Sequence, residues 1–178
     1  MFQVKEWEKK GLELENLSIN LSSIQFKNEN LTKDLLGMIN THQVNPNKVI
    51  LEITESIALQ DLDYTLKTIN ELKEIGIRIS LDDFGTGYSS LNYTKDIPFD
   101  EIKIDQSFVF NLFNNPKNKV ITKTIVSLGK GLGAIIVAEG IERQEHLDFL
   151  RNVNCDKGQG YLFDKPLPAN ELFSKYGK

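Results

Sequence analysis

Short apolar segments alternate with longer segments of helical periodicity along the whole chain. This alternation predicts an α/β fold with a parallel sheet wrapped by helices, because parallel strands need helix-length crossovers. The chain has 178 residues, of which 40% are hydrophobic, so we expect one domain over residues 1–178. The six expected strands are Leu17–Leu21, Val49–Thr54, Ile77–Asp83, Glu101–Asp105, Ala134–Glu139 and Gln159–Phe163.

Apolar residues at helical spacing mark the connecting helices. One pattern runs from Leu62 to Ile75 before Gly76, and another runs from Val120 to Leu132 before Gly133. Further helices are expected over Val4–Gly11, Leu31–Ile39, Leu147–Leu150 and Pro168–Lys175. Both histidines, His42 and His146, fall in charged helical segments and are expected at the surface.

Composition narrows the partners and the compartment. The formal net charge of -4 argues against a nucleic-acid backbone as partner. Cys155 is the only cysteine, so no internal disulfide can form and a reducing cytoplasm is expected. The N-terminus has no signal-peptide core and no apolar run reaches membrane-spanning length, so we expect no membrane insertion.

Two adjacent carboxylates, Asp82 and Asp83, stand between an apolar strand and a glycine-rich turn. Neighbouring strand residues point to opposite faces, so the two can share a metal region only if the strand ends and the backbone turns there. Gly85 and Gly87 permit such a turn. An acidic loop that caps the next helix is the alternative for this segment taken alone. A dinucleotide site is excluded, because the third glycine of that fingerprint is missing and carboxylates stand where a pyrophosphate would lie.

Each expected strand has, toward its C-terminal end, a residue that is costly to bury. In a barrel of parallel strands these ends share one face, where catalytic sites usually form. Helix capping favours Ser, Thr, Asp or Asn and does not explain repeated Glu. Crowded carboxylates need protonation or a bound cation, and oxygen ligands suit Mg²⁺ or Mn²⁺. The residues are Asn20, Glu52 with Glu55, Asp82 with Asp83, Lys103 with Asp105, Glu139 and Gln159.

Lys103 alternates with Ile102 and Ile104, so its amine should project from one face of the strand. One interpretation is a structural ion pair inside the barrel. The other is a cation that holds an attacking water or an anionic oxygen beside metal ions.

Seven short motifs cover nearly the whole chain. They are Asn20-Leu21-Ser22, Glu52-Ile53-Thr54-Glu55, the run from Asp82 to Leu91, Ile102-Lys103-Ile104-Asp105, Ala138-Glu139-Gly140-Ile141-Glu142, Gly158-Gln159-Gly160-Tyr161-Leu162 and Lys165-Pro166-Leu167-Pro168. Together they resemble the EAL family of cyclic di-GMP phosphodiesterases.

The resemblance implies a TIM-barrel-like fold in which two Mg²⁺ or Mn²⁺ ions activate a water that opens cyclic di-GMP to linear pGpG. It implies that the metals bind to Asn20, Glu52, Asp82, Asp83 and Glu139, with Asp82 and Asp83 serving the second ion. It also implies that Lys103 orients the water, that Gln159 stands beside it, and that Glu55 steadies the loop from Asp83 to Ser90. Asp83 and Glu142 would face the substrate at the catalytic mouth.

The sequence departs from the family pattern at its start. It contains no Glu-Ala-Leu motif, and the match begins at the helix Val4–Gly11, which follows that motif in the family. Six strands instead of the usual eight would leave two sheet edges and an apolar lumen exposed. We therefore expect a homo-oligomer, a partner segment that completes the barrel, or a rearranged edge.

Two other functions stay open at this point. The chain could be a catalytically inactive module that binds cyclic di-GMP or a protein partner, since one missing ligand can remove catalysis. An enolase-like barrel with Lys103 as the base is a third interpretation, which the adjacent aspartates disfavour.

Overall fold

The computed structural model describes residues 1–86 and 94–177. The strands in these ranges form a curled sheet in the order β1-β2-β3-β4-β5-β6, and every neighbouring pair is parallel. Their bounds are β1 Leu17–Asn20, β2 Val49–Thr54, β3 Arg78–Phe84, β4 Glu101–Ile104, β5 Ile135–Ala138 and β6 Lys157–Gly158. The predicted parallel sheet is confirmed, and β1 and β6 are its two edges.

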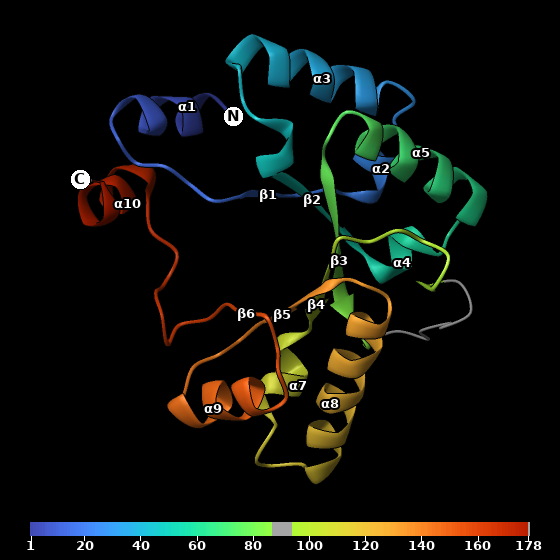
Figure 1. The fold of residues 1–178 in the computed structure, drawn as a ribbon, viewed down its shortest axis with the longest axis vertical. Helices are drawn as coiled ribbons and strands as arrows, with labels where there is room; N and C mark the ends of the chain where they lie inside the picture. The colour runs from blue at the N-terminus through green and yellow to red at the C-terminus, as the bar shows by residue number, and fades with distance from the viewer. Residues whose placement is uncertain (87–93, 178) are drawn as a thin grey trace.

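Helices connect successive strands and surround the sheet (Figure 1). In Figure 1, α1 and α10 lie near the two termini, and the Lys10 ammonium stands 5.7 Å from the centre of the Phe173 ring between them. The bounds are α1 Phe2–Lys9, α2 Ser23–Phe26, α3 Leu31–His42, the 3-10 helix η1 Pro46–Lys48, α4 Glu55–Ala58, α5 Leu62–Glu74, α7 Gln106–Phe110, α8 Pro116–Gly131, α9 Gln144–Asn152 and α10 Ala169–Tyr176. Within the described ranges, no helix is both long and apolar enough to cross a membrane.

The hydrophobic core lies between the outer face of the sheet and the helices. Strand residues such as Ile53, Leu81, Ile102 and Ile104 are buried there, because every second side chain of a strand points outward. Helix α8 approaches the sheet closely at Gly129, where an added Cβ would stand 2.1 Å from the Cδ1 atom of a β5 isoleucine. This position therefore favours glycine, because a larger residue would have to displace the Ile136 side chain.

The inner face of the sheet is largely polar, and the expectation of an apolar lumen is wrong. Ser18, Glu52, Glu101 and Lys103 line it together with Lys157 from β6. Ion pairs join these side chains, so exposing this lumen to water costs less than exposing an apolar surface.

The sixth strand was predicted over Gln159–Phe163, and this prediction is wrong. The strand is residues 157–158, and the following segment turns, with the Phe163 amide donating to the Gly160 carbonyl over 3.1 Å. Gly160 lies against the backbone of Ile141, where an added Cβ would come within 2.2 Å of the carbonyl oxygen. Only a turning chain without a side chain fits at that place.

The prediction that both histidines lie at the surface is also wrong for His146, which is fully buried. Its ring lies on the inner side of α9, one turn before the buried Leu150, and stacks on Phe113. His42 is partly exposed and meets the edge of the Phe2 ring.

Two aspartates tie neighbouring strands together at the amino ends of the sheet. Asp100, which precedes β4, accepts hydrogen bonds from the Ile79 amide at 2.9 Å and from Lys73 at 2.6 Å. Asp156, which precedes β6, accepts the same two kinds of bond, from the Ile136 amide of β5 at 2.9 Å and from Lys130 at 3.0 Å. The lysine stands near the end of the preceding helix in both cases.

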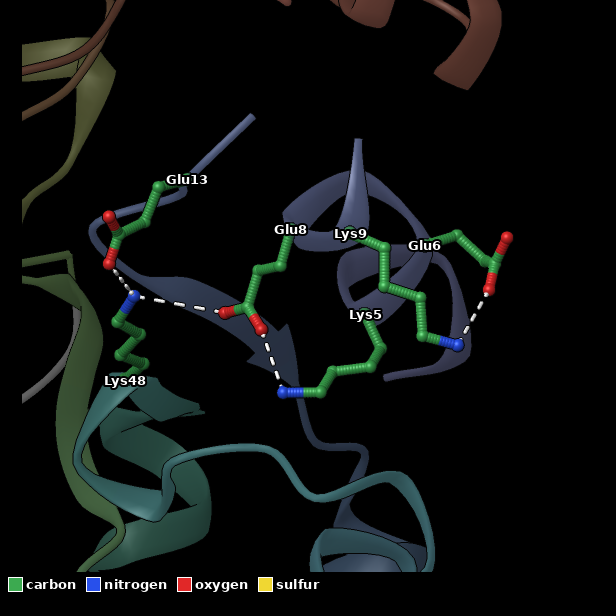
Figure 2. A network of polar contacts seen from close by, with 6 residues as sticks. All are labelled: Lys5, Glu6, Glu8, Lys9, Glu13 and Lys48. Carbon is green, nitrogen blue, oxygen red and sulfur yellow. Dashed lines mark hydrogen bonds and ion pairs between the residues drawn. The ribbon is translucent and has the colours of Figure 1, made fainter. Parts of the chain in front are cut away.

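Ion pairs fasten the first helix to the sheet (Figure 2). The Lys48 ammonium at the start of β2 lies 2.8 Å from Glu13 and 3.8 Å from Glu8 of α1. Glu8 also pairs with Lys5 at 3.0 Å within the helix. These contacts hold α1 and the loop after it near the amino end of β2.

Candidate functional site

Four charged side chains meet at the carboxyl ends of β2 to β5. The Lys103 ammonium lies 2.7 Å from Glu52, 3.1 Å from Asp82 and 2.8 Å from Glu139. Glu52 comes from β2, Asp82 from β3 and Lys103 from β4, and Glu139 directly follows β5. Four adjacent strands thus supply one side chain each.

Strand alternation explains why these side chains share a face. Lys103 stands between the buried outward residues Ile102 and Ile104, so its own side chain must point into the lumen. In the same way, Glu52 stands between the outward Leu51 and Ile53. The parallel register then places the carboxyl ends side by side.

The cluster keeps an excess of negative charge, because one ammonium faces three carboxylates. Burial acts to lower the pKa of Lys103, but hydrogen bonds to Glu139 and Glu52 outweigh it and raise this pKa. Burial raises the pKa of the Glu139 carboxyl, and the charges of Asp82 and Glu52 add to this while Lys103 opposes it. Such crowding favours the entry of a further cation.

The backbone of β3 leaves the regular strand conformation at Asp83, directly after Asp82. Asp83 has a φ of 56°, and the pairing of β3 with β4 shifts register between Leu81 and Phe84. The predicted turn therefore occurs as a bulge inside the strand, which continues to Phe84 instead of ending at Asp83. The Asp83 amide donates to the Asp82 carboxylate over 3.0 Å. Partial burial, followed by the charges of Asp82 and Asp105, raises the pKa of the Asp83 carboxyl.

Asn20 ends the edge strand β1 in register with Glu52. The two side chains therefore lie on the same face of the sheet, and that of Asn20 is exposed. Asp105, by contrast, caps α7, because its carboxylate accepts from the Ser107 amide at 2.9 Å. The helix-cap alternative therefore applies to Asp105.

Glu55 is buried at the first position of α4. The loop that it was expected to steady extends from Asp83 to Ser90, and residues 87–90 of that loop lie outside the described residues.

Glu142 and Gln159 line one pocket of about 360 Å³ together with Glu139. Gln106 and Tyr161 complete its walls, along with the glycines of the two loops. The pocket therefore adjoins the charged cluster through Glu139. Gln159 also borders a second cavity of about 180 Å³ inside the lumen, which reaches Glu52 and Lys103.

A second ion pair lies in that lumen and was not predicted from the sequence. The Lys157 ammonium lies 2.6 Å from Glu101, which is only 4% exposed. Glu101 precedes Lys103 by two positions in the same strand, so strand alternation was the signal that places both on one face. Lys157 had no such signal, because the position of β6 was predicted wrongly.

The donor set fits a hard divalent cation. Carboxylate oxygens from Glu52, Asp82 and Glu139, with the amide oxygen of Asn20 on the adjacent strand, are the ligands that Mg²⁺ and Mn²⁺ prefer. Over residues 1–86 and 94–177, no three acidic, histidine or cysteine side chains are already grouped around an empty metal position. The Lys103 ammonium lies between the carboxylates in the place that a cation would take.

Comparisons with known proteins agree with this arrangement. The EAL domain family matches residues 1–166. The bifunctional diguanylate cyclase/cyclic di-GMP phosphodiesterase MucR of Pseudomonas aeruginosa is 39% identical over 172 residues, which are 97% of this chain and 25% of MucR. The chain spans about a fifth to a quarter of the length of the curated relatives it matches.

Two solved structures show the same fold. The c-di-GMP complex of the PaMucR phosphodiesterase has a TM-score of 0.91 and 39% identity, over 96% of this chain and 69% of that chain. The manganese/cy-diGMP complex of Klebsiella pneumoniae BlrP1 has a TM-score of 0.82 and 28% identity, over 93% of this chain and 42% of that chain. The six-stranded sheet with its helices is therefore part of a TIM-barrel-like fold, as the sequence predicted.

Proposed function

Because this chain belongs to the EAL domain family, we propose that it acts in the metal-dependent hydrolysis of cyclic di-GMP to linear pGpG. The observation that carries this proposal is the cluster of Glu52, Asp82, Lys103 and Glu139 at the carboxyl ends of four adjacent strands. Divalent ions supply the charge that polarises a phosphodiester and lowers the pKa of a nearby water. Mg²⁺ and Mn²⁺ both suit the oxygen donors present.

The reaction joins the water oxygen to phosphorus and breaks the bond from phosphorus to the ribose 3′ oxygen, so that the product keeps a 5′ phosphate. A proton leaves the water and the 3′ oxygen gains one. We assign Asn20, Glu52, Asp82, Asp83 and Glu139 to hold the metal ions. The Lys103 ammonium would orient the water or stabilise an anionic oxygen of the phosphate.

The remaining assignments concern the mouth of the site. Gln159 and Glu142 line the 360 Å³ pocket beside Glu139, and this supports a place for Gln159 near the water and for Glu142 near the substrate. Asp83 would face the substrate as well as the second ion. Burial of Glu55 at the start of α4, next to β3, supports its role in holding the loop that follows Asp83.

We further propose that β1 and β6, the two sheet edges, are covered by a second copy of the chain or by a partner segment. Edge strands present unpaired backbone groups, which soluble proteins rarely leave open. Light scattering of the purified chain tests this, and a compact, stable monomer would contradict it. A cytoplasmic location is proposed from the single cysteine, Cys155.

Incubation with cyclic di-GMP and Mn²⁺, followed by separation of the nucleotides, tests the activity. The chain should produce pGpG, and Asp82→Asn should abolish the product while Asp63→Asn, an exposed change on α5, should not. An Asp82→Asn variant that still forms pGpG would overturn the assigned role. Calorimetry that finds tight binding of cyclic di-GMP without turnover would indicate a non-catalytic binding module instead.

A further inference from the structure

The loop over residues 139–143, between β5 and α9, forms one wall of the candidate site. It begins with Glu139, which contacts Lys103, and it includes Glu142, which lines the 360 Å³ pocket. Its middle is tied down by the Ile141 amide, which donates to the Gln159 carbonyl over 3.1 Å. Its end is Arg143, the residue before α9, whose side chain provides no hydrogen-bonded cap for that helix.

The Arg143 side chain turns onto His146 instead. Its Nε and Nη2 atoms lie 3.1 and 2.8 Å from the Nε2 atom of the imidazole. A guanidinium can only donate, so Nε2 must be an acceptor and cannot carry a hydrogen. His146 is therefore neutral, with its one N–H on Nδ1. Arg143 Nη1 also pairs with Glu145 at 2.5 Å.

The surroundings of His146 favour this neutral form. The ring is fully buried and stacks on Phe113, with 6.1 Å between centroids and 11° between planes. In the described part of the chain, Nδ1 has no hydrogen-bond partner, and a second N–H could form only on Nε2, where it would face the Arg143 guanidinium. The charged groups facing the ring are Arg143, Glu142 and Glu145 on its own segment. On the far side of Phe113, the Lys119 ammonium of α8 stands 4.3 Å from the ring centre.

We propose that His146 is a positioning residue whose neutral imidazole holds Arg143, and through it fixes the loop 139–143 that presents Glu139 and Glu142 to the pocket. Protonation of the ring would remove the acceptor and set an imidazolium against a guanidinium. The contact would then break, and the loop would lose its side-chain anchor at α9 while the His146 amide still donates to the Arg143 carbonyl over 3.1 Å. The consequence for substrate rests on the proposed function, whereas the anchoring of the loop does not.

Hydrogen exchange tests the anchoring without any substrate. At pH 7.5, His146→Leu keeps the apolar packing but has no acceptor, and we expect its Ile141 amide to exchange about tenfold faster than in the wild-type chain. His146→Gln supplies an amide oxygen that accepts and does not titrate, so its exchange should stay within about twofold of the wild-type rate. Arg143→Met removes the donor from an exposed position and should match His146→Leu, which decides the question if His146→Leu fails to fold. Unchanged protection of Ile141 in the folded variants that lack this contact would overturn the proposal.

The ring itself gives a second readout. In ¹⁵N spectra of histidine-labelled protein, His146 should show a protonated Nδ1 and an unprotonated Nε2 from pH 8 down to pH 6. A protonated Nε2 in this range would overturn the proposal.

Kinetics with cyclic di-GMP and Mn²⁺ then connect the loop to the site. Below pH 6, where the ring gains its second proton, KM should rise in the wild-type chain more steeply than in His146→Gln, with kcat changing less than KM. Equal pH profiles of KM would overturn the link to the pocket. A chain without any turnover would refute the proposed function, and the exchange result would still decide the anchoring on its own.

Discussion

Replacing Lys103 with methionine removes the one cation that the structure places between three carboxylates. Methionine has nearly the volume of the lysine stem, so the change isolates the charge. The side chains of Lys103, Glu52 and Asp82 are 7%, 9% and 15% exposed, which places the contact among buried ion pairs. Breaking such a pair by removing one partner costs about 3 to 5 kcal/mol, because the remaining charges stay buried without compensation.

We therefore expect Lys103→Met to lower the free energy of unfolding by about 3 to 5 kcal/mol in metal-free buffer. For a chain of this length, this corresponds to a fall in Tm of roughly 6 to 20 °C. Urea denaturation followed by circular dichroism measures the loss. Millimolar Mn²⁺ should restore more stability to the variant than to the wild-type chain, because the metal no longer competes with an ammonium for the same oxygens.

Two other lysines provide matched controls. Lys157→Met breaks a single pair with the buried Glu101 from a side chain that is 33% exposed, and its cost should be smaller than that of Lys103→Met. Lys130→Met breaks an exposed pair with Asp156 and should cost at most about 1 kcal/mol. The reasoning is refuted if Lys103→Met unfolds at the wild-type urea concentration, or if its loss does not exceed that of Lys130→Met.

Three further predictions follow from single positions. Burial, and then the charge of Arg143, lower the pKa of His146 below its ordinary 6.5. Below pH 6.5 the unfolded chain therefore binds more protons than the folded chain, so the stability contributed by the neutral ring is present above pH 6.5 and is lost as the pH falls. The urea midpoints of wild type and His146→Gln should diverge below pH 6.5. Burial raises the pKa of the Cys155 thiol from 9.0 to about 11, which lowers the fraction of reactive thiolate. At pH 8 a thiol reagent should therefore modify the folded chain about a hundredfold more slowly than the unfolded chain. Equal rates would contradict the burial. Gly129→Ala should lower the free energy of unfolding by about 1 to 3 kcal/mol, because its Cβ would collide with Ile136. Gly37→Ala in α3, with open space around it, should raise it by about 0.5 to 1 kcal/mol. Thermal melts that rank the two variants the other way would show that α8 does not approach the sheet as described.

Strand periodicity predicted the parallel sheet, the resemblance of the motifs predicted the family, and the positions of the strand ends selected Lys103 and the three carboxylates that meet it. Periodicity worked for β4 because its polar and apolar residues alternate strictly, and for β2 because its apolar run is short and rich in β-branched residues. It failed at Gln159–Phe163, where apolar residues follow one another but Gly160 must approach the backbone of Ile141. Local patterns do not report such long-range contacts.

The burial of His146 and the ion pairs of the lumen were not predicted from the sequence, because they too depend on long-range contacts. A histidine among charged neighbours is typical of an exposed helix face, and only the packing of Phe113 against α9 reverses that reading. The lumen was expected to be apolar because a closed barrel usually packs branched side chains inside. Glu101 and Lys157 are far apart in the sequence, and their pairing depends on the curl of the sheet.

The aspartate ties of Asp100 and Asp156 lie at the amino ends of the strands, opposite the charged cluster. Each tie couples a strand to the loop before the next strand and to the helix that leads into the first of the two strands, so the alignment of the sheet is maintained at the end remote from the chemistry. Side chains at the reactive end can consequently diversify through substitution while the scaffold beneath them keeps its alignment. A new specificity could then evolve at the carboxyl ends of the strands without any change to Asp100, Asp156 or their hydrogen bonds.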